Sequence, residues 1–206
     1  MLLGNKIESY ESVSDDYMEL IHDIYSDRIE DPSEAERLYS RFYKWITSTD
    51  FFTAPASTRF HGSFRQGLIY HHIDVYNEAM ELLKLDKFKD IEKHSAALVA
   101  LTHDYCKIGS YDTYLKNVKN EVTGQWEKVE AYKWDVPQYP FGHGVTSMYV
   151  AQQFFHLTRE EALAIRWHMA EYNVCDSEMC DLQEARDRYP LVLMLQMADR
   201  MSITNY

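Results

Sequence analysis

Apolar residues recur along most of the chain at the three- and four-residue spacing of amphipathic helices. Two start signals support this pattern: Asp31 followed by Pro32, and Thr158 followed three residues later by Glu161, which forms a capping box. Residues 50–66 are predicted to form a loop. The predicted helices cover residues 15–26, a segment that starts at Pro32, 67–85, 90–105, a segment that opens after Gly144, 159–169 and 189–202.

The periodicity changes between residues 114 and 134. The segment "YLKNVKNEVTGQWEKVEAYKW" alternates apolar and polar residues on both sides of Thr123-Gly124, which is typical of a β-hairpin. No repeat, low-complexity segment or domain linker interrupts the rest. The sequence therefore predicts a mainly α fold, a helical bundle with one small β-hairpin insertion.

Composition limits the classes of partner. The chain has 206 residues, of which 46% are apolar, and a net charge of −12. Such a charge disfavours long nucleic acids, whose binding depends on Lys and Arg, but a small phosphorylated ligand stays possible if a bound cation supplies positive charge.

Three cysteines, Cys106, Cys175 and Cys180, form no C-x-x-C pair and are predicted to be reduced thiols. With no signal-like segment or membrane-length apolar run, the expected location is the cytoplasm, without a membrane partner.

The segment "LVALTHDYCKIGSY", residues 98–111, contains the first candidate site. An apolar run leads directly into His103-Asp104, and Lys107 follows three residues later. Buried charge is costly unless it is paired or bound to a metal ion, so these residues are predicted to line a site. A second His-Asp pair, His22-Asp23, lacks the lysine and lies in an acidic segment, which favours a surface position.

Two other predicted helices carry a polar residue where the pattern calls for an apolar one. These are His71, directly after the apolar Leu68-Ile69, and Asp199, within "LVLMLQMADR". Two histidines and two aspartates make a mixed nitrogen and oxygen ligand set suited to Mn, Fe, Co, Ni, Zn or Mg. Alternatives for single members are a hydrogen-bonded core histidine and, for Asp199, an ion pair with Arg200 or another arginine.

The ordered pattern His71, His103-Asp104, Asp199 resembles the HD superfamily of metal-dependent phosphohydrolases. Three quoted motifs carry the resemblance: "HGSFRQGLIYHHIDV" is similar to the first-ligand helix, "LTHDYCKIG" to LxHDxxKxG, and "FGHGVTS" with "AIRWHM" to two histidine segments of a subset with extended metal sites. The match covers residues 58–205. It implies an HD domain over 58–206, with residues 1–57 as a helical extension packed on it.

The resemblance also implies roles for individual residues. The first metal ion would be bound by His71, His103, Asp104 and Asp199, and Asp104 could bridge to a second ion. His143 and His168 would bind that second ion or, with a single ion, face the phosphate. Lys107 would contact a phosphate oxygen, beside Asp104 in the catalytic centre.

Further residues are predicted around this set. His61 and Arg65 precede the first ligand and are candidate substrate contacts, and Tyr111 could stack on a base. His72 is expected in the second layer or on the surface, because it points away from His71 on the same helix. His94 and His156 are expected on the surface.

The chemistry of such a set favours hydrolysis of phosphate esters. A divalent ion activates water and offsets the negative charge of a phosphoryl group, and Lys107, one turn from Asp104, can stabilise charge that develops on the phosphoryl oxygens. The predicted function is a metal-dependent phosphohydrolase acting on a nucleotide or other small phosphate ester or anhydride. Alternatives are a 3′–5′ exonuclease or phosphodiesterase on short nucleic acid, a non-catalytic HD sensor that binds metal and nucleotide, and a plain helical scaffold.

Overall fold

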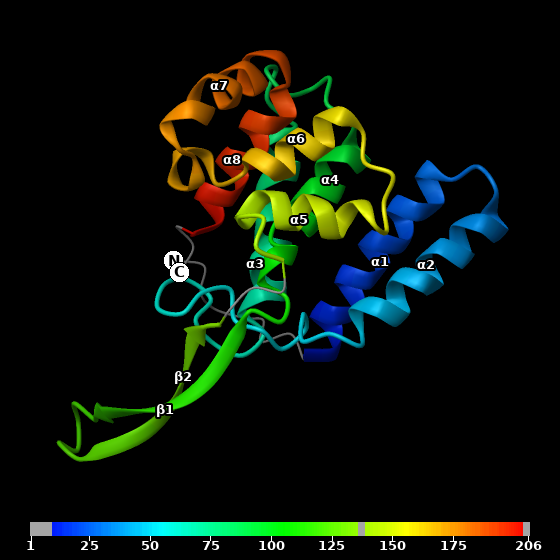
Figure 1. Cartoon of the computed structure of the whole chain (residues 1–206). Helices are drawn as coiled ribbons and strands as arrows, with labels where there is room; N and C mark the ends of the chain where they lie inside the picture. The colour runs from blue at the N-terminus through cyan, green and yellow to red at the C-terminus, as the bar shows by residue number, and fades with distance from the viewer. Residues whose placement is uncertain (1–9, 136–138, 204–206) are drawn as a thin grey trace.

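The computed structural model describes residues 10–135 and 139–203 (Figure 1). Its fold is mainly helical with one two-stranded antiparallel sheet, as predicted. The longer helices are α1 (Tyr10–Arg28), α2 (Pro32–Ile46), α3 (Gly67–Leu82), α4 (Lys93–Thr102), α5 (His143–Gln152), α6 (Arg159–Trp167), α7 (Met179–Arg188) and α8 (Pro190–Ser202). Three single-turn 3₁₀ helices are η1 (Tyr105–Lys107), η2 (Ala170–Asn173) and η3 (Asp176–Glu178).

Helix α4 lies at the centre of the bundle and contacts α1, α3, α5, α6 and α8. Its residues 96–102 are all buried, as expected for a helix that is apolar on every side. The predicted helix 90–105 is too long at both ends. The Glu92 carboxylate caps the helix by accepting hydrogen bonds from the N–H groups of His94 and Ser95, which places the first turn at Lys93.

At its other end, α4 stops where two side chains donate hydrogen bonds to the carbonyl group of Leu101. The hydroxyl of Tyr17 and Nδ1 of His72 both donate to the carbonyl oxygen of Leu101, each at 2.8 Å. The hydroxyl of Tyr105 lies 2.7 Å from that of Tyr17. Helix α1 therefore holds the end of α4 directly, and its apolar residues belong to the same core cluster as those of α3, α4 and α8.

The loop before α3 is fixed by close backbone contacts. The N–H groups of Gln66 and Leu68 donate to the carbonyls of Thr53 and Ala54. A Cβ atom on Gly67 would lie 1.9 Å from the carbonyl oxygen of Gly62, so only glycine fits at this position. The predicted loop 50–66 is confirmed, and α3 begins at residue 67 as expected, although it ends at Leu82 rather than at residue 85.

Helices α5 and α6 are also in backbone contact. A Cβ atom on Gly144 would lie 2.1 Å from the carbonyl oxygen of Arg166. Helix α5 was predicted to open after Gly144 but begins at His143. The predicted capping box of α6 is confirmed: the Thr158 hydroxyl accepts the N–H of Glu161, and the Glu161 carboxylate accepts the N–H of Thr158.

Sequence periodicity did not predict α7. This short helix buries only Leu182 and Ala185, which is too few apolar positions to give a helical pattern. Helix α1 extends beyond the predicted 15–26 at both ends. No helix in the described ranges is both long and apolar enough to cross a bilayer.

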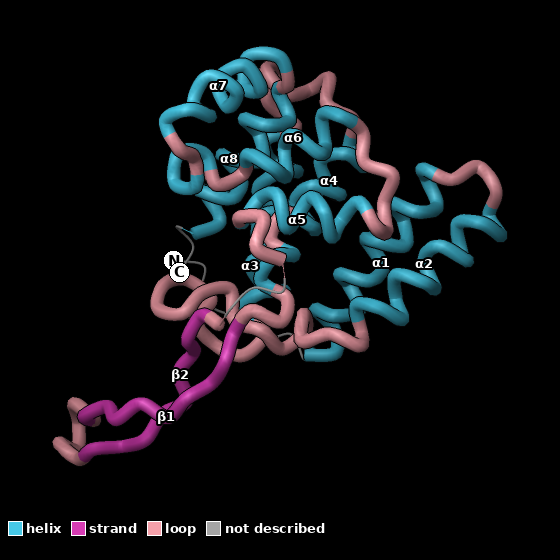
Figure 2. The backbone as a smooth tube through the Cα atoms, in the orientation of Figure 1, coloured by secondary structure: helices cyan, strands magenta, loops and turns pink. Residues whose placement is uncertain are grey.

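The predicted hairpin is confirmed and slightly longer than expected. Strands β1 (Tyr111–Lys119) and β2 (Trp126–Trp134) pair antiparallel, with Tyr111 opposite Trp134 and Lys119 opposite Trp126. Figure 2 shows the hairpin, in magenta, extending away from the helices. The pair begins four residues after Lys107, so the hairpin is anchored beside the His103-Asp104 segment.

Candidate metal centre

Four polar side chains from three helices converge at the end of α4. His71 comes from α3, Asp199 from α8, and His103 and Asp104 directly follow α4. Nε2 of His71 lies 3.2 Å from Nε2 of His103, 3.4 Å from Oδ2 of Asp104 and 3.3 Å from Oδ1 of Asp199. Nε2 of His103 lies 3.6 Å and 3.9 Å from the same two carboxylate oxygens.

These separations fit the ligands of one divalent ion. Metal–ligand bonds of about 2.1 Å place neighbouring ligand atoms about 3.0 Å apart at right angles and about 3.4 Å apart at the tetrahedral angle. His71, His103 and Asp104 also form a group of buried ligand atoms in which all atoms lie within 4.8 Å of one another. The ligand atoms of these three side chains are spaced as the ligands of one cation, and Oδ1 of Asp199 lies beside the group, 3.3 Å from Nε2 of His71.

Hydrogen bonds on the far side of two imidazoles leave the inward-facing nitrogens free. Nδ1 of His103 lies 2.8 Å from the carbonyl oxygen of Ala100, and Nδ1 of His168 lies 2.7 Å from that of Ile165. A carbonyl oxygen only accepts, so Nδ1 carries the proton in both rings and the inward-facing Nε2 presents a lone pair. Nε2 of His168 is buried and makes no hydrogen bond, which is the state expected of a metal ligand.

A second group forms around the other oxygen of Asp104. Nε2 of His143 lies 2.7 Å from Oδ1 of Asp104, and Nε2 of His168 lies 3.4 Å from the same atom. The thiol of Cys106 is also within 4.8 Å of a ligand atom of both Asp104 and His143. The contact of Gly144 with the backbone of α6 sets the relative positions of His143 and His168, whose ring centroids lie 5.2 Å apart.

Lys107 supplies positive charge beside Asp104. Its Nζ lies 2.6 Å from Oδ2 of Asp104, because the turn of η1 brings the side chain back over the carboxylate. Burial alone lowers the pKa of Lys107, but the charge of Asp104 outweighs it and raises the pKa. Lys107 is therefore protonated at neutral pH.

The charge states of the remaining groups follow from burial and from one another. Burial lowers the pKa of His103 to about 3, so its ring is neutral. Burial also lowers the pKa of His71, but contacts with Asp104 and Asp199 outweigh it and raise the pKa. Burial raises the pKa of both carboxyl groups, but Lys107 and the histidines lower that of Asp104, and the histidines lower that of Asp199, well below the usual range. Both aspartates are therefore ionised ligand candidates.

Three side chains of the centre are partly exposed to solvent. The side chains of Asp199, His143 and Lys107 keep 15%, 20% and 12% of their exposure, whereas those of His71 and His103 are almost fully covered. A ligand would therefore approach from the side of Asp199, His143 and Lys107.

The three predicted substrate contacts, His61, Arg65 and Tyr111, differ in their burial and in their neighbours. The ring of His61 packs 5.2 Å from that of His71, and its buried Nδ1 has no hydrogen-bond partner. Burial lowers the pKa of His61 to about 4. Tyr111 is half-buried near Lys107 and donates a hydrogen bond to the carbonyl oxygen of Ala56. Arg65 is exposed, and its charge acts on Tyr132 of β2.

Two further side chains support the centre, and sequence analysis named only the first. His72 is completely buried and donates to Leu101 as described above, so it lies in the second layer, one of its two predicted positions, and not on the surface. Ser202, one helical turn after Asp199, places its hydroxyl 3.4 Å from Nδ1 of His71. The dipeptide His71-His72 and the spacing between Asp199 and Ser202 were the available signals. The surface position predicted for His22-Asp23 agrees with the structure, in which His22 contacts Glu36.

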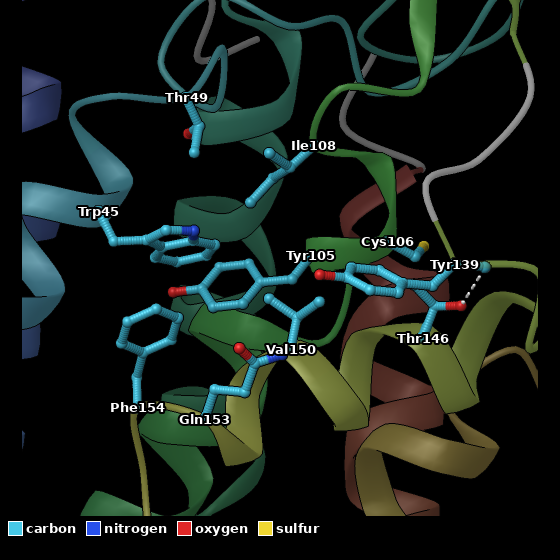
Figure 3. A pocket seen from close by; sticks show the side chains of 10 residues that line it. All are labelled: Trp45, Thr49, Tyr105, Cys106, Ile108, Tyr139, Thr146, Val150, Gln153 and Phe154. Carbon is cyan, nitrogen blue, oxygen red and sulfur yellow. Dashed lines mark hydrogen bonds between the residues drawn. The ribbon is translucent and has the colours of Figure 1, made fainter.

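A small cavity lies behind the segment that carries Asp104 (Figure 3). It has a volume of about 80 Å³, well below the several hundred Å³ of a typical ligand pocket. Figure 3 shows the rings of Trp45, Phe154 and Tyr105 on one side and that of Tyr139 on the other, with Cys106 nearby. The cavity is too small for a nucleotide and is not a substrate site.

Comparisons of the chain with protein-family models, with curated proteins and with solved structures find no match. The resemblance to the HD superfamily therefore depends on the motif residues alone and stays a prediction.

Proposed function

We propose that the protein is a metal-dependent phosphohydrolase that acts on a nucleotide or another small phosphate ester or anhydride. The observation that carries the proposal is the arrangement around Asp104. One carboxylate oxygen faces His71 and His103, the other faces His143 and His168, and Lys107 lies beside the first. Two groups of cation ligands that share one carboxylate, with a lysine beside it, match the needs of phosphate chemistry.

The residues divide into two ligand groups that share Asp104. His71, His103, Asp104 and Asp199 would hold the first ion, and Asp104, His143 and His168 a second. Nitrogen and carboxylate oxygen donors in this ratio suit Mn, Fe, Co, Ni, Zn or Mg. Such an ion, when bound, offsets the negative charge of a phosphoryl group and promotes attack by water.

The chain's own residues would bind and orient the phosphate. Lys107 pairs with Asp104 in the structure, and a cation bound by Asp104 would weaken that pairing and leave the ammonium group to contact a phosphoryl oxygen. There Lys107 would stabilise the charge that develops as water adds to phosphorus and the bond to the leaving oxygen breaks. His61, whose ring packs 5.2 Å from that of His71, would donate a hydrogen bond to the same phosphate group.

The accessible side of the centre favours a small substrate. Asp199, His143 and Lys107 keep only 12–20% of their side-chain exposure, and Tyr111 lies near Lys107. The net charge of −12 repels a long polyanion. A phosphate group presented at the end of a small molecule satisfies both limits.

The test is a screen of purified protein, loaded separately with each of the six metal ions, against nucleoside mono- and triphosphates, cyclic nucleotides and short phosphodiesters. Released phosphate and released nucleoside are both measured, because their ratio identifies the bond that breaks. The Asp104→Asn variant should lose all turnover. The matched control is Asp23→Asn, which changes the second His-Asp pair of the chain and should keep full turnover. Turnover that is equal in Asp104→Asn and the unchanged protein would exclude the proposal.

A further inference from the structure

Beyond Tyr111, the β-hairpin lies outside the candidate metal centre. Strands β1 and β2 pair with each other in a sheet of two strands, and the hairpin extends away from the bundle (Figures 1 and 2). An isolated two-stranded hairpin is at best marginally stable in water. A pair of nine-residue strands in this position therefore needs a partner.

Both faces of the hairpin expose large apolar side chains. One face carries Leu115, Trp126 and Trp134, and the other carries Tyr114, Val118 and Val129. Trp126 and Leu115 keep 71% and 65% of their exposure. A ligand that stacks on a single face, such as a nucleic acid strand, would leave the other face in water, whereas a partner that adds strands to the sheet extends both faces at once.

The strand edges are open to such addition. Neither strand contains proline or glycine, which interrupt strand pairing. Each strand carries two lysines, which discourage edge pairing unless acidic residues lie opposite them. In a two-stranded sheet, each strand has one edge whose N–H and C=O groups lack a strand partner. These groups form a template for a further antiparallel strand.

The charges of β2 are complementary to those of a second copy of the same strand. If two β2 strands pair antiparallel about a two-fold axis at Val129, Lys128 of each copy lies opposite Glu130 of the other, and Trp126 lies opposite Tyr132. Opposite charges directly across a strand pair stabilise it. On β1, the acidic residue Asp112 is already paired: its Oδ2 lies 3.2 Å from Nζ of Lys133 in the same hairpin.

The distribution of net charge agrees with this arrangement. Residues 111–134 contain four lysines and four acidic residues, so the whole net charge of −12 lies outside the hairpin. Two copies that meet through their neutral hairpins keep their acidic helical bodies apart, which limits electrostatic repulsion.

We propose that two copies of the chain associate through β2, in register about Val129, to form a four-stranded antiparallel sheet. The pairing would be isologous, because each copy contributes the same strand. It is independent of the proposed phosphohydrolase activity.

The test is a charge-reversal experiment with mass measured by analytical ultracentrifugation. The unchanged protein should have twice the chain mass of 24.4 kDa. Lys128→Glu places two glutamates opposite each other, and Glu130→Lys places two lysines opposite each other, so each variant alone should be monomeric. An equal mixture of the two variants removes the repulsion, because one copy then carries two acids that face two lysines of the other, and it should be dimeric. Charge reversal at Glu121, outside both strands, should have no effect.

A cross-link identifies the register. In a Cys175→Ser/Cys180→Ser background, Val129→Cys should form a disulfide between copies on oxidation, whereas Val122→Cys, at the hairpin end, should not. A monomeric unchanged protein at its highest soluble concentration would overturn the proposal. So would a dimer whose mass is unaffected by both charge reversals, or one whose Val122→Cys variant cross-links instead. Hairpin-dependent binding of a fluorescent oligo-dT by a monomeric protein would identify single-stranded nucleic acid as the partner in its place.

Discussion

The Nε2 atoms of His71 and His103 lie 3.2 Å apart in the interior of the protein. His103 presents a lone pair there, because its other nitrogen donates to Ala100, and the two aspartate oxygens next to these nitrogens are negatively charged. Four electron-rich atoms in such proximity repel one another unless a proton or a cation lies between them. Contacts with Asp104 and Asp199 raise the pKa of His71, which favours a proton at this position.

A divalent ion should replace that proton and stabilise the fold. We predict that the purified protein retains a divalent metal ion and that a chelator lowers its melting temperature, because an ion that binds only the folded state stabilises it. His103→Ala and Asp104→Ala should each lose the ion and become insensitive to chelator. Metal content by mass spectrometry and thermal unfolding check this, with His22→Ala and Asp23→Ala as controls. Full metal occupancy in either site variant would contradict the ligand assignment.

Lys107→Ala should separate metal binding from turnover. The variant removes a charge beside Asp104 but leaves every predicted ligand in place, so the metal ion should stay bound. Turnover should fall by about a hundredfold or more, the range found when a group that stabilises transition-state charge is lost. Steady-state kinetics on the best substrate of the screen measure the effect. The control is Lys133→Ala, which removes an exposed ion pair of the hairpin; equal activity of the two variants would remove Lys107 from the mechanism.

His143→Ala and His168→Ala decide between one ion and two. Both histidines face Oδ1 of Asp104, on the opposite side of the carboxylate from the first ligand group. We predict that each variant binds one ion fewer per chain while the other ion stays bound, because the first group does not use either histidine. If both variants keep the original metal-to-protein ratio and only raise KM, the two rings contact the phosphate and the centre holds a single ion.

The stability of the metal-free protein should fall on acidification. The pKa of buried His72 is well below its usual value of 6.5, and that of His103 is about 3. Below pH 6.5 the unfolded chain therefore binds protons that the folded chain does not, and stability decreases as the pH falls towards 3. His71 acts in the opposite sense: its raised pKa stabilises the fold at low pH, and this contribution is lost as the pH rises through the folded-state pKa.

Replacing His72 isolates one part of this dependence. His72→Gln keeps a donor for the Leu101 carbonyl but does not titrate, so the slope of stability against pH should decrease by up to about 1.4 kcal/mol per pH unit. Urea unfolding of the metal-free protein between pH 4 and pH 7 measures the slope. The exposed His156 provides the control variant, His156→Gln. An unchanged slope in His72→Gln would mean that His72 is protonated in the folded state.

Tyr17→Phe tests how α1 supports the centre. The variant removes a buried hydroxyl that donates to Leu101 and contacts Tyr105, so the free energy of unfolding should fall by about 1–3 kcal/mol. Urea unfolding measures the change, and Tyr43→Phe, at a half-exposed site on α2, should change stability much less. A loss no greater than that of Tyr43→Phe would show that these hydrogen bonds contribute little.

The sequence predicted the convergence of the candidate ligands but not the groups that support them. His71, His103, Asp104 and Asp199 interrupt apolar helix patterns, and a polar residue in such a position requires a partner in the core. Tyr17 gives no such signal, because its hydrogen bond to Leu101 spans 84 residues and no local pattern encodes a pair that distant. The end of the helix at Thr102 was missed for the same lack of a local signal, because side chains from α1 and α3 both donate to the carbonyl oxygen of Leu101.

The origin of the candidate ligands on three helices has a kinetic consequence. His71 and His103 are 32 residues apart, and Ser202, one turn beyond Asp199, is 131 residues from His71. No locally folded fragment contains the complete ligand group, so an ion acquires all its ligands only after α3, α4 and α8 have docked. Contacts made after the folding barrier change the rate of unfolding rather than that of folding. Metal binding would therefore lengthen the lifetime of the folded protein without accelerating its formation.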